Sequence, residues 1–216
     1  MTGGDFWLRH ALLPSLVFAL VATTLAASGA DLVVTDHFFD VAGGRFPARN
    51  AFWAAELMHR GGRWIVFATG MTAVLVWLTT RRDDAGYVAL CFALGPGLVA
   101  LLKHFSAADC PWALARYAGD LASGGHCFPA GHSSGAFAFF AFYFVLPEPH
   151  FRRAALGLAL ALGFAFAATQ WARGAHFPTH DLWSAWICWN VCLVLAAWRL
   201  RPSAVVARWP AAGIAS

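Results

Sequence analysis

Six stretches of the chain are almost continuously apolar, and short polar segments separate them. The stretches cover residues 11–30, 64–80, 85–102, 128–146, 154–172 and 182–198. Each approaches the roughly 20 apolar residues with which a helix crosses a bilayer. None of them alternates between apolar and polar positions, as the strands of a membrane barrel do. The pattern therefore predicts an all-α integral membrane protein built as a six-transmembrane-helix bundle.

The composition agrees with this prediction and narrows the class. Hydrophobic residues make up 60% of the 216 residues, charged residues make up only 12%, and there are 11 Trp and 19 Phe. A chain of this length usually forms one domain, so we expect a single membrane domain over residues 1–216. The net charge of +4 is spread along the chain, which argues against nucleic acid as a partner and leaves the lipid bilayer.

The arginines indicate an orientation. If the N-terminus is cytoplasmic, two tight cytoplasmic turns carry the pairs Arg81-Arg82 and Arg152-Arg153. Basic residues in short loops favour the cytoplasmic side, so we expect both ends of the chain inside. The longest polar connection, residues 31–63, is then extracytoplasmic. Within it the sequence predicts an interfacial helix over residues 50–58, interpreted as a packing lid without chemistry.

Six crossings would also bring distant polar groups to one face. The end of the third span at Lys103, the start of the fourth at His132 and the connection over residues 172–181 must lie on the same side. Ionisable groups at membrane depth are costly and mark functional sites. Two histidines with cations and an acid suit phosphoryl transfer. Cations stabilise the phosphate oxygens, one imidazole attacks phosphorus, and the other protonates the leaving oxygen.

Three motifs within residues 103–181 resemble those of the type 2 phosphatidic acid phosphatase (PAP2) superfamily. Pro129-Ala-Gly-His132 is similar to the second motif, usually Pro-Ser-Gly-His, and Gly174-Ala-His176-Phe-Pro-Thr is similar to the third. Lys103 and Pro111 fall where the first motif has its lysine and proline. The resemblance extends from the third span to the sixth, and the pattern looks like that of a divergent bacterial membrane branch.

The resemblance implies a metal-independent phosphatase without cofactors, acting on a lipid phosphate or diphosphate at the periplasmic face of a bacterial inner membrane. His176 would form a phosphohistidine, and His132 would be the general acid. The phosphate would be held by cations and by backbone N–H groups at a helix N-terminus. These groups belong to Lys103, Arg116, Arg173, Gly131 and Ser133.

The chain departs from the family pattern at three positions. Cys110 and Gln170 stand where two phosphate-binding arginines are expected, so Arg116 and Arg173 are the expected replacements. The family's aspartate, four residues past the nucleophile, is His180 here, and Asp181 follows it; either would orient His176. A lipid phosphotransferase on the same scaffold and a noncatalytic lipid-binding or transport relative remain alternatives, although retention of both motif histidines favours an enzyme.

The cysteines and the histidine spacing add two further expectations. Cys110 and Cys127 share one extracytoplasmic loop, where an oxidising compartment would permit either a disulfide or two free thiols. The other three cysteines lie within spans and are expected to be packing residues. His176 and His180 have a spacing known from metal sites. Pro178 between them starts a helix rather than continuing one, so no metal is predicted.

Overall fold

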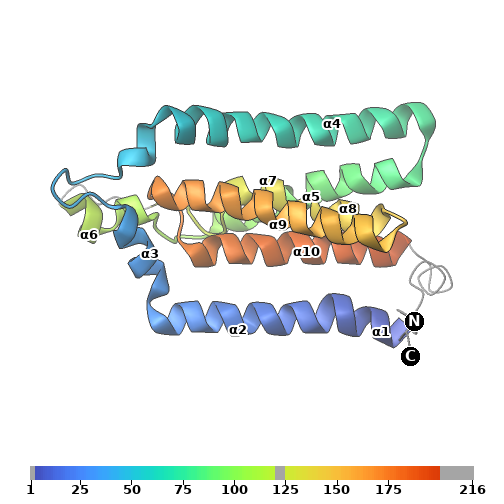
Figure 1. Cartoon of the computed structure of the whole chain (residues 1–216), viewed down its shortest axis with the longest axis horizontal. Helices are drawn as coiled ribbons and strands as arrows, with labels where there is room; N and C mark the ends of the chain where they lie inside the picture. The colour runs from blue at the N-terminus through green and yellow to red at the C-terminus, as the bar shows by residue number, and fades with distance from the viewer. Residues whose placement is uncertain (1–2, 120–124, 200–216) are drawn as a thin grey trace.

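The computed structural model describes residues 3–119 and 125–199, which form a bundle of roughly parallel helices (Figure 1). Five helices in this part of the chain are long and apolar enough to cross a membrane: Gly4–Ser28, Trp53–Thr80, Asp83–Phe105, Pro149–Ala172 and Pro178–Arg199. The prediction of an all-α fold is confirmed for the described residues, and these five helices are the candidates for the predicted membrane spans. The basic tail that follows Arg199 lies outside the described residues.

Two of the five long helices combine several labelled elements, and three are single α-helices. The first consists of α1 (Gly3–Trp7), the π-helical turn η1 (Leu8–Leu12) and α2 (Leu13–Ser28). The second consists of the π-helical segment η3 (Trp53–Gly61) and α4 (Gly62–Thr80), and α5 (Asp83–Phe105), α9 (Pro149–Ala172) and α10 (Pro178–Arg199) are the others. α9 and α10 both begin with proline, which is tolerated there because the first N–H groups of a helix have no intrahelical partner.

The predicted fourth span is not a single continuous α-helix. It is divided into α7 (Gly131–Phe137) and α8 (Phe140–Val145). Between them the Phe139 N–H donates to the Ala136 carbonyl and the Ala141 N–H to the Ala138 carbonyl, each at 3.1 Å. These bonds between residues three apart tighten the helix locally. The largely apolar sequence of 128–146 predicts burial, but it does not predict this tightening.

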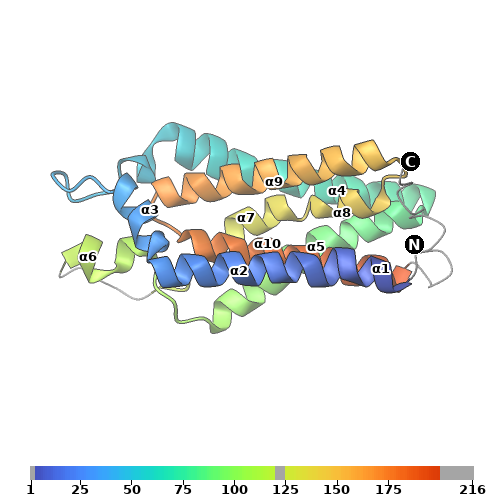
Figure 2. The same ribbon diagram turned by 60° about the horizontal axis from the view of Figure 1, so that its bottom comes forward.

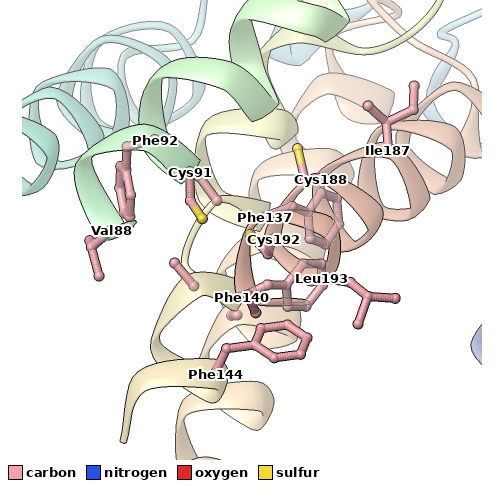
Figure 3. Close-up of a cluster of buried hydrophobic side chains, with 14 of the residues drawn as sticks. Val88, Cys91, Phe92, Phe137, Phe140, Phe144, Ile187, Cys188, Cys192 and Leu193 are labelled. Carbon is pink, nitrogen blue, oxygen red and sulfur yellow. The ribbon is translucent and has the colours of Figure 1, made fainter. Parts of the chain in front are cut away.

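The two short helices occupy the centre of the bundle. α5, α9 and α10 all pack against α7, and the views in Figures 1 and 2 agree on this placement. Residues 133–137 of α7 are buried without exception. The main apolar core lies where α7 and α8 meet α5 and α10 (Figure 3), and its labelled members are Val88, Cys91, Phe92, Phe137, Phe140, Phe144, Ile187, Cys188, Cys192 and Leu193. The three cysteines of the spans are therefore buried and free, as predicted.

The outer faces of the bundle are apolar as well. α2 buries none of its residues and exposes side chains such as Leu16, Val17 and Leu20. Exposed apolar surface along a whole helix is expected where lipid, and not water, surrounds the protein.

The two ends of the bundle are different. One end carries α3 (Ala30–Phe38), η2 (Pro47–Asn50), η4 (Pro111–Ala113) and α6 (Ala115–Ala118), which together form a cap (Figure 2). The other end carries the two arginine pairs, Arg81-Arg82 in the turn between α4 and α5 and Arg152-Arg153 in the first turn of α9 (Figure 1). Arg199 also lies there and donates to Asp84.

Replacing Phe137 by alanine should lower the free energy of unfolding by about 3–5 kcal/mol, because truncating a buried aromatic ring leaves a cavity. The Phe137 ring is 0% exposed and packs on Phe140 and Phe164. Thermal unfolding of the purified protein in detergent measures the effect. Phe151→Ala is the matched control, since that ring on α9 is 54% exposed. Equal melting temperatures for the two variants would contradict a core centred on α7.

Candidate active site

The second and third motifs meet at the capped end of the bundle. The Ala130 N–H donates to the His180 carbonyl at 3.2 Å, and the Ser184 hydroxyl donates to the Ala130 carbonyl at 2.8 Å. These two bonds tie the segment before α7 directly to the first turns of α10. His132 and His176, which flank the junction, are thereby held on one face of the protein.

His176 lies in the short connection between α9 and α10 and is buried. Its Nδ1 lies 2.9 Å from the carbonyl oxygen of Cys127. A carbonyl only accepts, so Nδ1 carries the proton, and in the neutral ring the lone pair is on Nε2. The sequence pointed to His180 or Asp181 as the group that orients this ring, whereas in the structure a main-chain carbonyl makes the orienting bond.

The surroundings of His176 keep its ring neutral. Burial lowers the pKa of His176 well below its ordinary value of 6.5, and the positive charge of Lys103 lowers that pKa further. His180 and His132 act on it in the same direction. The four side chains come from α5, α7, α10 and the connection between α9 and α10. A neutral imidazole with a free Nε2 lone pair is the form that can act as a nucleophile.

Lys103 lies in the last turn of α5 and reaches the start of α7. Its Nζ is 4.0 Å from the position that a Cβ on Gly131 would take. The half-buried ammonium therefore stands beside the first turn of α7. The Ser133 hydroxyl, by contrast, is buried and bonds to the Ala130 carbonyl at 3.5 Å. Lys103 and the main chain near Gly131 make this side of the site positive.

His132 contacts two aromatic rings. The ring of Phe166 stacks on it with 4.9 Å between centroids, and the ring of His59 lies at 4.4 Å. The His132 Nε2 lies 3.3 Å from the Met58 carbonyl and donates to it, so protonation of the ring would place its second N–H on Nδ1. Gly62 permits this packing, because a Cβ there would lie 2.4 Å from Phe166 Cζ.

His59 and Arg63 lie at the candidate site, although the sequence did not single them out. They lie one helical turn apart, and Arg63 Nη2 is 3.0 Å from His59 Nε2. On the other side of the ring, His59 Nδ1 is 3.3 Å from the amide nitrogen of Gln170. Both belong to the long polar connection, residues 31–63, that was interpreted as a lid. Their four-residue spacing is common in helices, and only the contacts with α7 and α9 reveal them.

The two arginines expected to replace the missing motif arginines lie in different places. Arg173, at the end of α9, donates to Gln170 Oε1 at 3.1 Å and to the Arg49 carbonyl at 3.2 Å. Arg116, in α6, pairs with Asp36 of α3 on an exposed surface, and this pairing lowers the pKa of Asp36. Arg173 is thus linked through Gln170 to the histidines, whereas the guanidinium of Arg116 is engaged by a carboxylate.

Buried polar groups fix the start of α10. Asp31 accepts the Thr179 N–H at 3.0 Å and so caps this helix. Asp181 is completely buried and accepts the indole N–H of Trp171 at 2.7 Å. Asp181 Oδ1 and His180 Nδ1 have no hydrogen-bond partner within the described part of the chain.

The loop around His176 is held from two sides. Cys110 and Cys127 lie at disulfide distance, with 5.1 Å between their Cα atoms, so the pairing that the sequence left open is confirmed. Because Cys127 supplies the carbonyl for His176, this bond also fixes the acceptor. Gly174 has a φ of +67°, and a Cβ there would lie 2.5 Å from the buried ring of Phe46. No other residue type fits this turn without strain.

The burial of His176 predicts a loss of stability in acid. An unfolded histidine takes up a proton below pH 6.5, while folded His176 does not because its pKa is lowered. Stability should therefore decrease as the pH falls below 6.5, by up to about 1.4 kcal/mol per pH unit from this group. His176→Asn keeps a donor for the Cys127 carbonyl without the titration. On acidification, its melting temperature should fall less than that of the wild type. Equal dependence of the two melting temperatures on pH would contradict a neutral buried ring.

Comparison with known proteins agrees with this geometry. The family model described as PAP2 superfamily matches residues 84–203, from the start of α5 to just beyond α10. No match was found among curated proteins or among solved structures. The matched range covers more than half of the chain and contains Lys103, His132 and His176, so the chain belongs to the PAP2 superfamily.

Proposed function

We propose that the protein hydrolyses a phosphate monoester or diphosphate of a membrane lipid through a phosphohistidine on His176. Family membership indicates phosphatase-type activity on a phosphorylated substrate. The observation that carries the finer proposal is the hydrogen bond from His176 to the Cys127 carbonyl. It leaves the Nε2 lone pair for attack, next to the charge of Lys103.

In the proposed reaction, Nε2 of His176 attacks phosphorus and the bond from phosphorus to the leaving oxygen breaks. Protonated His132 gives its proton to that oxygen. Water then attacks the phosphohistidine, passes a proton to His132 and releases inorganic phosphate, which regenerates both rings. Lys103 and Arg173 stabilise the charge on the phosphoryl oxygens. The N–H groups near Gly131 and Ser133 add to this stabilisation.

His180 and Asp181 support the site in this proposal. The ring of His180 lies edge-on to that of His176, with 6.0 Å between centroids. Asp181 interacts electrostatically with Lys103 from its buried position. We assign His180 to holding the plane of the His176 ring and Asp181 to holding the ammonium. Arg116 has no role in the proposed step, because Asp36 engages it.

We also propose that residues 1–216 form one membrane domain with six crossings, in which α7 and α8 together make the fourth. Two features support a site that faces the periplasm of a bacterial inner membrane. The arginine pairs lie at the opposite end of the bundle, where positive charge favours the cytoplasm. The disulfide lies at the site end, and disulfides persist in oxidising compartments.

A groove between α4, α5 and α8 supports a lipid as the substrate. Its volume is about 1260 Å³, and it extends from Ile65, directly after the missed site residues, towards Arg82 near the other end of the bundle. Most of its lining is apolar and includes Val76, Val88, Phe142 and Val145. Such a groove can hold a hydrocarbon chain while the phosphate lies among the histidines.

Phosphate release from lipid phosphates in detergent should persist in EDTA and depend on both histidines. His176→Asn should abolish release, because the orienting bond is retained but the nucleophile is lost. His132→Gln keeps a donor for the Met58 carbonyl and should lower kcat by about 10²–10⁴-fold. His150→Gln is the control, since His150 is exposed at the start of α9. Release that survives in His176→Asn would contradict the proposed chemistry.

Reduction of the disulfide should lower kcat by about tenfold or more, because a small displacement of the Cys127 carbonyl misaligns His176. The measurement compares initial rates before and after reduction, with alkylation to confirm that Cys110 and Cys127 are free. A Cys110→Ala/Cys127→Ala variant should start at the lower rate and not respond to the reductant. Full activity with both thiols free would show that the disulfide does not position the nucleophile.

A further inference from the structure

The hydrogen bonds around His59 cannot all be made by the protein itself. A neutral imidazole has one N–H and one lone pair. The His59 Nε2 faces Arg63, which only donates, and the Nδ1 faces the amide nitrogen of Gln170, which also donates. Both ring nitrogens would have to accept, and a neutral histidine cannot do so.

Turning the Gln170 amide does not remove the conflict. The amide oxygen would then accept from Nδ1, but the amide nitrogen would face Arg173, another group that only donates. The four side chains form a row in the order Arg173, Gln170, His59 and Arg63. The guanidinium groups at its two ends only donate hydrogen bonds, whereas the amide and the neutral imidazole between them each donate one and accept one. Wherever the ring proton lies, two donors face each other at one position of the row. The row therefore lacks one acceptor.

The charges around the row agree with an anionic acceptor. Arg63 and Gln170 both contact the ring of His59. That ring lies 4.4 Å from the ring of His132, the predicted general acid, and Arg173 joins the group through Gln170. Arg63 is exposed, and the groove begins directly beyond it at Ile65. Gln170, which stands where the resemblance expects an arginine, is buried within the row and joins its two halves. Arg63 and Arg173, from two other places in the chain, thus supply the positive charge that is absent at position 170.

We propose that Arg63 and His59 bind the phosphate group of the substrate, with an oxygen of the phosphate placed between Arg63 and His59 Nε2–H. This inference rests on the proposed function and deepens it, since it assigns the phosphate subsite to the start of α4, outside the three motifs. A phosphate oxygen accepts from both groups at once and completes the row. Arg173 keeps Gln170 in the orientation in which its amide nitrogen donates to His59.

Titration calorimetry with inorganic phosphate tests the subsite without turnover. Arg63→Gln should weaken phosphate binding by on the order of 10- to 100-fold, the loss expected for a charge-assisted hydrogen bond. Arg63→Lys keeps the charge without the planar fork and should lose less. Arg60→Gln is the matched control, because Arg60 is exposed on the same helix and pairs with Glu56 at 2.6 Å. Its phosphate affinity should stay within about twofold of the wild type.

Competition by phosphatidic acid micelles separates recognition of the phosphate from recognition of the lipid. Arg63→Gln should lower the affinity for inorganic phosphate and the affinity for the lipid phosphate by the same factor. A loss confined to the lipid, an affinity for phosphate unchanged in Arg63→Gln, or a wild type that does not bind phosphate would each overturn the inference. Thermal unfolding of each variant confirms that it is folded, and Arg63→Lys provides the comparison if Arg63→Gln is not.

The same experiments distinguish this inference from the proposed function. If the wild type binds phosphate through Arg63 but releases none from any lipid phosphate, the subsite stands and the hydrolytic function fails. If hydrolysis is observed and Arg63→Gln binds phosphate normally, the function stands and the subsite is wrong.

Discussion

The site depends on one hydrogen bond, from His176 Nδ1 to the carbonyl of Cys127. It sets the tautomer, directs the Nε2 lone pair and gives the buried ring a partner. The rest of the local structure holds this bond in place. The disulfide fixes the residue that carries the carbonyl, Gly174 allows the turn that precedes the ring, and Asp31 caps the helix that follows it. A buried ring that is held in this way is preorganised for the nucleophilic role that we propose for it.

Much of the architecture follows from the sequence. Continuous apolar stretches indicate burial in lipid or protein, and five of the six predicted stretches lie in helices that are long and apolar enough to cross a membrane. The even number of predicted crossings between Lys103, His132 and His176 placed them on one face, and the structure brings them together. The sequence did not predict the division of the fourth span, because local tightening of a buried helix changes hydrogen bonding without changing the apolar pattern.

The missed parts of the site share a physical reason. The acceptor for His176 is a backbone carbonyl, and every residue has one, so no side-chain pattern marks it. His59 and Arg63 lie in a connection whose composition predicts only a surface cover. Their importance comes from contacts with Gln170 and His132, which are distant in the chain. Motifs identify the residues that a family shares, whereas the compensation that we propose for Cys110 and Gln170 depends on contacts between residues distant in the chain.

Detection of the covalent intermediate tests the central claim most directly. The protein would be mixed with a lipid phosphate, quenched with base within the first turnover, and digested for mass spectrometry under conditions that preserve phosphohistidine. We predict a phosphoryl group on His176, attached at Nε2 and labile to acid. Hydrolysis that proceeds without a phosphorylated protein, or a phosphoryl group found on another residue, would contradict it.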